Sequence, residues 1–286
     1  MLPTHGQLNT PNYRELDVPR MSSGVLFVAF DSVTDQGNTL RYTELAKINA
    51  NLVKRHLGLP VGIVTDKPIA GFDEQIIVGK PAADTRHVLL KDVHESYNWY
   101  NDYRRQLYNL TPFDRTLLLD ADYFLQTNQY LKCFEFDAPF QLIKTVYDPT
   151  NRKSFDKYIS LPNRTIPQYW ATAMYWNRDA ATHFEYANMI AENYQYYSRV
   201  FGFTDKQYRN DMVFSIVAHM LPTYAMPWRM WMTSSDSKMI DANRSGLKFN
   251  YNNSVIRINT DVHVLSKDIM HENNLEILHQ WSIADD

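Results

Sequence analysis

Two apolar runs separated by an amphipathic segment occupy residues 24–65, and this order constrains the fold more than any other feature of the chain. The first run, GVLFVAF at 24–30, has no polar interruption, which is typical of a strand buried on both faces. Apolar residues then recur at helical spacing over 42–57, and Gly58 is typical of a helix end. VGIVT at 61–65 predicts a second strand. A strand, a helix and a strand in this order predict a right-handed crossover between parallel strands, and therefore an α/β fold.

The same patterns predict the elements of the remaining chain. TLLL at 116–119 predicts a central strand. Other strands are expected at 76–78, 169–176 and 255–266, and helices at 96–110, 179–200, 206–220 and 272–283. Residues 144–167 have no clear period, so we expect a long functional or mobile loop there.

Length and composition favour one folded unit. The chain has 286 residues, of which 44% are apolar, and this is enough for one large α/β domain. Residues 1–23 are mostly polar and are interrupted by proline, so we expect an extended N-terminal segment. No repeat, low-complexity tract or clear linker divides the rest, which favours a single domain over 24–286.

Charge and cysteine content exclude several classes of protein. A formal net charge of −3 gives no overall attraction to nucleic acid or to an anionic membrane. Cys133 is the only cysteine, which excludes an internal disulfide framework and a cysteine-based zinc site. The N-terminal residues lack the apolar core of a signal peptide, and no segment approaches the length of a membrane span. We therefore expect a cytoplasmic protein without a membrane partner.

Asp120 and Asp122 directly follow the apolar run TLLL. The carboxyl end of a parallel strand is where open α/β sheets bind ligands. An isolated buried carboxylate is strongly penalised, so we expect a cation beside these acids. Two hard oxygen ligands one residue apart suit Mg²⁺ or Mn²⁺ that also bridges the phosphates of a substrate. The alternative is that both acids cap a helix or a turn.

With LLLDAD placed after a strand–helix–strand unit, the chain resembles the GT-A glycosyltransferases over residues 24–266. It looks most like their glycogenin and galactosyltransferase-like retaining family. The resemblance implies a Rossmann-like mixed sheet flanked by helices, with a nucleotide-binding half at 24–125. The acceptor half and the C-terminal segment would then occupy 126–286. It also implies that Asp120 and Asp122 bind Mn²⁺ or Mg²⁺ and the diphosphate of a nucleotide-sugar donor.

Further positions take roles only through this resemblance. His263, in DVHVLS, would complete the metal site. Asn210 and Asp211 would be catalytic, with Asp211 as a general base or a sugar-binding acid. Donor-binding residues would come from the first strand, its loop and later segments: Ala29, Phe30, Asp31, Ser32, Arg104, Thr172 and Lys267. The alternatives are a solvated helix charge for Arg104, a first-turn helix acid favoured by the helix dipole for Asp211, and a structural histidine for His263.

The acceptor is less defined by the sequence. Five basic residues alternate with three aromatic ones between Lys144 and Arg164, an arrangement that can hold a phosphate backbone and stack a base. Because some phage glycosyltransferases modify hydroxymethylated DNA bases, such DNA is a candidate acceptor. A small glycoside is the alternative, with this segment as a mobile acceptor lid. An aromatic content of 14% suits a site that stacks flat rings such as sugars or bases.

Three other classes share parts of this pattern. Haloacid dehalogenase-like phosphatases also end a strand in Asp-x-Asp, but on their first strand. A nucleotidyltransferase would carry a glycine-rich loop after the first strand, which DSVTDQGNTLR at 31–41 matches poorly. A non-catalytic nucleotide- or carbohydrate-binding module would hold the diphosphate without turnover. The favoured function is therefore a metal-dependent glycosyltransferase that moves a hexosyl or pentosyl group to a hydroxyl acceptor.

Overall fold

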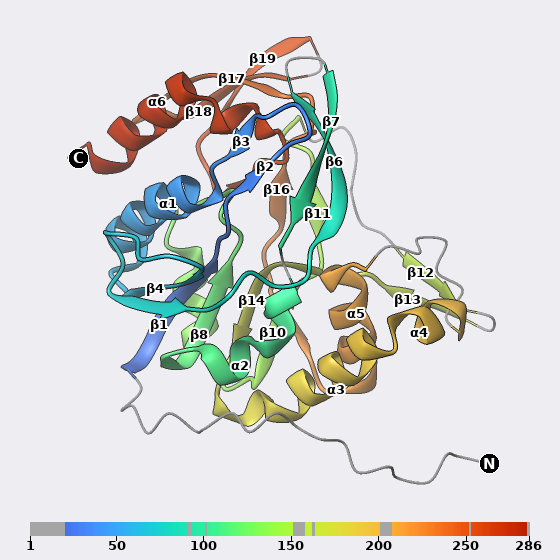
Figure 1. Ribbon diagram of the computed structural model, residues 1–286. Helices are drawn as coiled ribbons and strands as arrows, with labels where there is room; N and C mark the ends of the chain where they lie inside the picture. Colours follow the sequence, from blue (N-terminus) through green and yellow to red (C-terminus); the bar gives the residue numbers. More distant parts are fainter. Residues whose placement is uncertain are drawn as a thin grey trace, which may run out of the picture.

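In a computed structural model of the protein, the described residues are 21–90, 93–100, 102–150, 158–161, 164–200, 208–251 and 253–284. A mixed seven-stranded sheet with helices on both faces forms the centre of the molecule (Figure 1). In spatial order its strands are β15 (Tyr224–Ala225), β10 (Phe140–Ile143), β14 (Trp170–Trp176), β8 (Phe113–Leu119), β1 (Met21–Val28), β4 (Val61–Thr65) and β5 (Glu74–Ile77). The expected α/β class, with a mixed sheet flanked by helices, is confirmed.

The strand–helix–strand unit forms as its sequence predicts. β1 and β4 pair in parallel, with Val25 opposite Val61, and α1 (Tyr42–Leu57) connects them. α1 ends where Gly58 adopts a φ of 63° and donates its N–H to the Lys54 carbonyl, in a conformation that glycine adopts without steric penalty. β8 pairs in parallel with the other edge of β1, so the carboxyl ends of all three strands lie at the same edge of the sheet.

β14 makes the sheet mixed, because it runs antiparallel to β8 with Ala173 opposite Leu119. All of β14 and the last four residues of β8 are buried. A strand buried on both faces needs apolar residues at nearly every position, which explains why neither segment alternates clearly between apolar and polar residues. Their pairing also brings the start of β14 to the end of β8, where the two aspartates follow.

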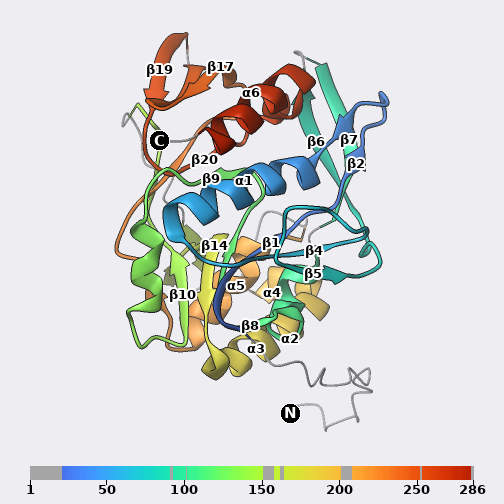
Figure 2. The same cartoon turned by 90° about the vertical axis from the view of Figure 1, so that its left-hand side faces the viewer.

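Helices cover both faces of the central sheet (Figure 2). Beyond α1 they are α2 (Leu107–Leu110), α3 (Ala181–Glu192), α4 (Tyr194–Val200), α5 (Asn210–Met220) and α6 (Glu272–Ile283), with short 3-10 segments η1 (Asp102–Gln106), η2 (Gln129–Phe134), η3 (Arg178–Ala180) and η4 (Lys267–Met270). α1 packs on one face, and α6 lies along α1, where the Arg55 guanidinium donates to the carbonyls of Trp281 and Ser282. α3 and α5 cover the other face.

A second sheet brings the C-terminal segment to the end of β8. In spatial order its four strands are β11 (Val146–Tyr147), β16 (Met230–Met232), β20 (Val262–His263) and β9 (Tyr123–Phe124). β9 follows the two aspartates directly, and its antiparallel pairing with β20 sets His263 opposite Tyr123. The Val264 N–H also donates to the Asp122 carbonyl at 2.9 Å. Backbone pairing therefore carries a histidine to an acid 141 positions away in the chain.

Smaller antiparallel pairings surround these sheets. They are β2 (Ser32–Val33) with β3 (Thr39–Leu40), β6 (Asp84–Leu90) with β7 (Val93–Trp99), β12 (Tyr158–Leu161) with β13 (Arg164–Pro167), and β17 (Lys238–Asn243), β18 (Gly246–Tyr251) and β19 (Ser254–Ile258) as a three-stranded sheet. A bridge between Thr34 and Tyr97 attaches the β6–β7 hairpin to the loop after the first strand.

Within the described ranges, no helix has both the length and the apolar character needed to cross a membrane.

The expected helix at 96–110 is wrong over its first part. Residues 96–99 belong to β7, and the helical segments begin only at Asp102, as η1 and then α2. Aromatic side chains such as Tyr97 and Trp99 suit a strand as well as a helix, and pairing with β6 decides between the two.

Other boundaries also differ from the expectation. The helix expected at 179–200 is divided into η3, α3 and α4, and α5 begins only at Asn210. The strand expected at 255–266 consists of β19 and β20, and the loop expected at 144–167 contains β11, β12 and β13. α6 confirms the terminal helix. β1 begins at Met21, and the preceding part of the expected N-terminal segment lies outside the described residues.

Candidate functional site

A hydrogen-bonded turn at the end of β8 presents the two aspartates. The Asp120 N–H donates to the Thr172 carbonyl at 2.9 Å, which continues the pairing with β14 by one residue. The Asp120 carbonyl then accepts from the Tyr123 N–H at 3.0 Å and closes a four-residue turn, in which aspartate is favoured at the first position. Asn49 in α1 donates its side-chain amide to the Ala121 carbonyl at 2.7 Å. The turn is thus held by the sheet on one side and by α1 on the other.

His263 joins the two acids through the β9–β20 pairing. Its Nε2 lies 3.1 Å from Asp122 Oδ1 and 3.9 Å from Asp120 Oδ2. One potential ligand atom from each of the three residues lies within 4.8 Å of the others. Two carboxylates and one imidazole form a ligand set that fits Mn²⁺ and is acceptable to Mg²⁺. The three residues expected to bind a metal ion therefore lie together.

Two cations, both largely removed from solvent, balance the two carboxylates. The Arg104 guanidinium bonds to Asp120 Oδ1 and to the Ala171 carbonyl, and its residue is only 4% exposed. The Lys267 ammonium lies 2.5 Å from Asp122 Oδ2 and 5.3 Å from the centre of the Tyr42 ring. Both basic residues were expected to bind the donor, and both contact the acids of the expected metal site. Asp122 is buried and Asp120 is partly buried, and a cation beside each acid offsets the penalty for removing its charge from water.

The charges at Asp122 and Lys267 stabilise each other. Burial opposes the charged form of Asp122, but Lys267 and His263 outweigh burial and hold the pKa of this carboxyl well below its usual range. Burial likewise favours the neutral form of Lys267, but the Asp122 carboxylate outweighs it and raises the pKa of the lysine above its usual value. The pair is therefore ionised on both sides.

Asp211 approaches the same region from α5. It lies in the first turn of that helix, where the helix dipole favours an acid, and Oδ1 accepts from the Ala171 N–H at 2.7 Å. Ala171 thus receives Asp211 on its N–H and Arg104 on its carbonyl. Burial raises the pKa of Asp211 above the usual value of 3.8. Asn210 is buried next to it and accepts from the Tyr208 hydroxyl at 2.8 Å.

These residues line a cavity of about 530 Å³, within the range of small-molecule sites. Of the residues expected to bind donor or metal or to act in catalysis, those at the cavity are Phe30, Arg104, Asp120, Asp122, Thr172, Asn210, Asp211, His263 and Lys267. Thr172 Oγ1 also lies 3.4 Å from His263 Nδ1. The cavity joins the carboxyl end of β8 to the N-terminal end of α5.

Three of the four residues expected to hold the nucleoside do not line this cavity. Ala29 is buried in the core, and the Ser32 hydroxyl donates to the Asn98 carbonyl at 2.7 Å. Phe30 does line the cavity, and its ring stacks on that of Tyr103 with 5.8 Å between centroids. The fourth residue, Asp31, belongs to a different cavity.

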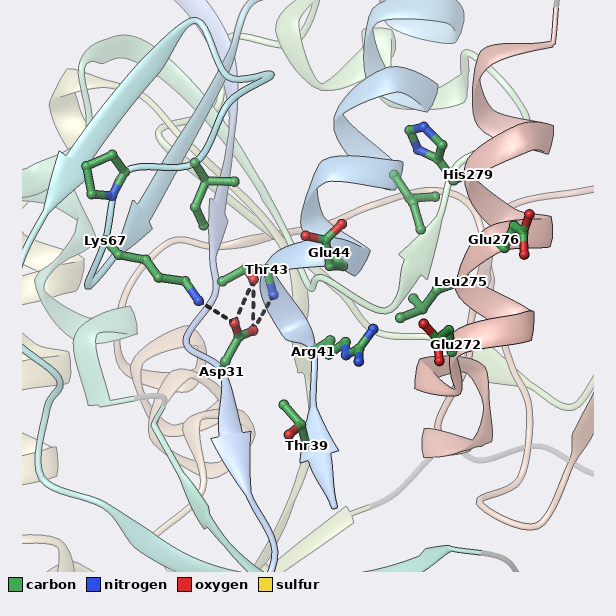
Figure 3. A pocket seen from close by; sticks show the side chains of 13 residues that line it. Asp31, Thr39, Arg41, Thr43, Glu44, Lys67, Glu272, Leu275, Glu276 and His279 are labelled. Atoms are coloured by element: carbon green, nitrogen blue, oxygen red, sulfur yellow. Dashed lines mark hydrogen bonds and ion pairs between the residues drawn. The ribbon is translucent and has the colours of Figure 1, made fainter. Parts of the chain in front are cut away.

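Asp31 organises the start of α1. Its carboxylate accepts from the backbone N–H and the hydroxyl of Thr43 at 3.0 and 2.9 Å, and from the Lys67 ammonium at 2.8 Å (Figure 3). These contacts provide the cap that Arg41, the residue before the helix, does not supply from its own side chain. Asp31 also lines a second cavity of about 550 Å³ between α1 and α6, whose exposed acids include Glu44 and Glu276.

Several residues at the site were not expected. Asn49 is a polar residue on the apolar face of α1, and that departure from the apolar pattern is a signal that the sequence contains. Tyr42, Trp99 and Trp170 line the cavity as well. The high aromatic content of the chain is consistent with them, but nothing in the sequence separates these rings from those of the core.

The basic and aromatic segment from Lys144 to Arg164 is described only in part. Tyr147 lies in β11, where the Arg229 guanidinium stands 4.6 Å from the centre of its ring. Arg152, Lys153 and Lys157, together with Phe155, lie outside the described residues.

Comparison with known proteins finds similarity only among solved structures. No family model matches the sequence, and no curated protein matches it. The galactosyltransferase LgtC in complex with donor and acceptor sugar analogues is 10% identical, with 91% of this chain and 95% of LgtC covered and a TM-score of 0.47. Mouse xyloside xylosyltransferase 1 is 12% identical, with coverages of 76% and 89% and a TM-score of 0.44.

The glycosyltransferase GlyE of Streptococcus pneumoniae TIGR4 is 10% identical, with 72% of this chain covered and a TM-score of 0.41. The match spans only 45% of GlyE. All three proteins are glycosyltransferases, the class that the sequence resembles. At these identities and scores the function has to be argued from the site itself.

Proposed function

We propose that the protein is a metal-dependent glycosyltransferase that moves a sugar from a nucleotide-diphosphate-sugar to a hydroxyl acceptor. One observation carries the proposal: Asp120, Asp122 and His263 converge at the carboxyl end of β8, beside a cavity of about 530 Å³. This is the edge of an α/β sheet at which ligands bind. The division into a nucleotide-binding half at 24–125 and an acceptor half at 126–286 belongs to the same proposal.

Asp120, Asp122 and His263 would hold Mn²⁺ or Mg²⁺. Such an ion, when bound, neutralises a diphosphate and stabilises the charge that develops on it as a leaving group. Lys267 and Arg104 place two further positive charges at the same acids, and Lys267 has the flexible side chain needed to reach a phosphate oxygen. The chain's own residues thus supply both the metal ligands and the cationic surroundings that a diphosphate requires.

Asp211 is the candidate for acting on the acceptor or the donor sugar. It lines the same cavity as the metal-site acids and is attached to the β14 backbone through Ala171. The raised pKa of Asp211 makes its carboxylate a stronger base, because the pKa lies closer to the pH at which the protein works. A stronger base accepts a proton from a hydroxyl group more readily. We assign it the role of general base or sugar-binding acid, with Asn210 beside it.

The acceptor is proposed from the sequence alone. Hydroxymethylated DNA and a small glycoside are the two candidates, and the transferred group is a hexose or a pentose. The cytoplasm is the proposed location. If DNA is the acceptor, neutralising Arg152, Lys153 and Lys157 together should weaken DNA binding and reduce its salt dependence by up to about three phosphate contacts, while donor hydrolysis persists. If the wild type does not bind DNA at low salt, a small glycoside is the remaining acceptor candidate.

A mass-spectrometric screen of nucleotide-sugars tests the function directly. The wild type with Mn²⁺ should hydrolyse at least one donor slowly and transfer its sugar when a suitable acceptor is added, whereas chelation of the metal should stop both reactions. Cleavage between the two phosphates of the donor, which releases sugar 1-phosphate and transfers the nucleoside monophosphate to an acceptor or to water, would instead indicate nucleotidyl transfer. Diphosphate binding without turnover on any acceptor would indicate a non-catalytic module, and no binding of any nucleotide-sugar would refute the proposal.

A further inference from the structure

The strand that carries His263 to the two aspartates is very short. β20 consists of Val262 and His263 alone, and it pairs with β9 through these two residues, opposite Phe124 and Tyr123. Its parallel pairing with β16 on the other edge is equally short. A slip of one residue would turn the imidazole to the opposite face of the sheet. The position of His263 therefore depends on what holds the chain on either side of β20.

Asp261 holds the chain directly before β20. Its Oδ1 accepts from the backbone N–H groups of Gln126 and Thr127 at 2.7 and 2.8 Å. Its Oδ2 accepts from the Thr127 hydroxyl at 2.9 Å and from the side-chain amide of Gln129 at 2.8 Å. The Gln126 side-chain amide also donates to the Thr260 carbonyl at 2.6 Å. All of these donors belong to the segment that follows β9, so the carboxylate connects the beginning of β20 to the end of β9.

We propose that Asp261 is a positioning residue, which fixes the register of β20 against β9 and so keeps His263 at Asp122. Asp261 is only 1% exposed, and a slip in register would take its buried charge away from the donors that satisfy it, which is unfavourable. At the other end of β20 the Val264 N–H donates to the Asp122 carbonyl at 2.9 Å. This inference rests on the proposed function, because it takes His263 as a metal ligand.

The partners of Asp261 differ from those of the two metal-site acids. Asp120 and Asp122 are paired with Arg104 and Lys267, whereas the four groups that donate to Asp261 are uncharged. Asp261 is also absent from the lining of the cavity and from the group of converging ligand atoms. An effect of Asp261 on metal binding therefore has to pass through the position of His263.

The test compares Asp261→Glu with Asp261→Asn by calorimetric titration of the full chain with Mn²⁺. The glutamate variant keeps the charge but is one methylene longer, so its carboxylate meets the same donors only if β20 moves. The asparagine variant keeps the length and one oxygen for the two backbone N–H groups. Asp261→Glu should weaken Mn²⁺ binding about fivefold or more, and Asp261→Asn by less than about twofold. If Asp261 acted through its charge, the order of the two variants would be reversed, and the inference would be overturned.

A double-mutant cycle with His263→Ala tests the route of the effect. If Asp261 acts only through His263, adding Asp261→Glu to His263→Ala should cause no further loss of Mn²⁺ affinity, whereas additive losses would contradict the inference. Ile190→Ala is the matched control, because it truncates a fully buried residue of α3 on the other face of the sheet. It should lower the stability and leave Mn²⁺ affinity unchanged. If Asp261→Glu does not fold, Asp261→Ala replaces it in the same cycle.

A measurement on the metal-free protein separates this inference from the proposed function. The NMR signal of the His263 imidazole, identified by its absence in His263→Ala, should shift clearly more in Asp261→Glu than in Asp261→Asn or Ile190→Ala. Equal shifts in the three variants would overturn the positioning role. A wild type that binds no Mn²⁺ would refute the metal-dependent function, and the NMR comparison would still decide whether Asp261 positions His263.

Discussion

Two cavities of nearly equal volume touch the N-terminal turn of α1, and they differ in how they hold charge. The cavity at Asp120 and Asp122 measures about 530 Å³, and the one between α1 and α6 about 550 Å³. In the first, two converging carboxylates are paired with Arg104 and Lys267, which are largely removed from solvent. In the second, the acids on α1 and α6 are exposed to water.

The difference shows that volume does not identify a functional site. An exposed carboxylate keeps its hydration and needs no partner, so a chain can carry many without consequence. A buried carboxylate must be paired, and the elements that pair it must come together in the fold. Four separate segments supply Arg104, the two aspartates, His263 and Lys267 to one place. In the α1–α6 cavity the Asp31 carboxylate is also paired, with Thr43 and Lys67, but there it caps α1. The convergence of two aspartates with a histidine and two cations is therefore the stronger sign of chemistry.

The largest effect is expected at Asp122. Asp122→Asn should lower the rate of donor hydrolysis by about 10³-fold or more, because a metal ligand is lost and leaving-group stabilisation with it. The same change leaves the Lys267 ammonium without its buried partner, so the free energy of unfolding should also fall. Kinetics and thermal denaturation of the same preparation separate the two losses. Near-normal turnover in the folded variant would show that Asp122 does not bind a catalytic metal ion.

The next effect is expected at Asp211. Asp211→Asn should lower the transfer rate by about 10²-fold or more if this acid is the general base. The same variant should be more stable than wild type near pH 7, because burial raises the pKa of Asp211 and so penalises its ionised form. The gain should disappear as the pH falls below the ordinary carboxyl value of 3.8, where the acid is neutral in both states. Denaturation of the variant and the wild type at several pH values measures this difference in the free energy of unfolding. Full activity in the variant would show that Asp211 is not the general base and that its role is the hydrogen bond with the Ala171 N–H.

A smaller effect is expected at His263. His263→Ala should raise the Mn²⁺ concentration needed for half-maximal activity by about tenfold, since two carboxylate ligands remain. His263→Gln keeps a polar side chain at the same backbone position and serves as the comparison. Metal titration with both variants decides the case, and an unchanged requirement would make the histidine a structural residue of β20.

The smallest effect is expected in the other cavity. Glu276→Gln changes an exposed acid on α6, so the free energy of unfolding should move by no more than about 0.5 kcal/mol. Donor hydrolysis should match the wild type. A clear loss of activity here would contradict the contrast between the two cavities, because it would give the exposed acids of α1 and α6 a part in the reaction.

The sequence by itself determined the parts of the protein that depend on local periodicity. Strands near 24–30 and 61–65, the helix at 42–57 and the terminal helix at 272–283 follow from the spacing of apolar residues. The placement of Asp120 and Asp122 at the end of a parallel strand follows as well, since TLLL precedes them directly. The segment at 96–99 shows the limit of this reasoning, because its aromatic residues suit either period and only pairing with β6 selected a strand.

The family resemblance grouped His263 with Asp120 and Asp122, but the tertiary structure decided how these distant residues meet and which cations pair with them. His263 and Asp122 are 141 positions apart, and their contact depends on the register of β20 against β9, which no local pattern encodes. The same holds for Lys267, whose charge could equally have stayed in water, and for Asp31, which caps α1 instead of lining the cavity of Asp120 and Asp122. A side chain's partners are set by long-range pairing and by the need to compensate buried charge, and both arise only when the chain has folded.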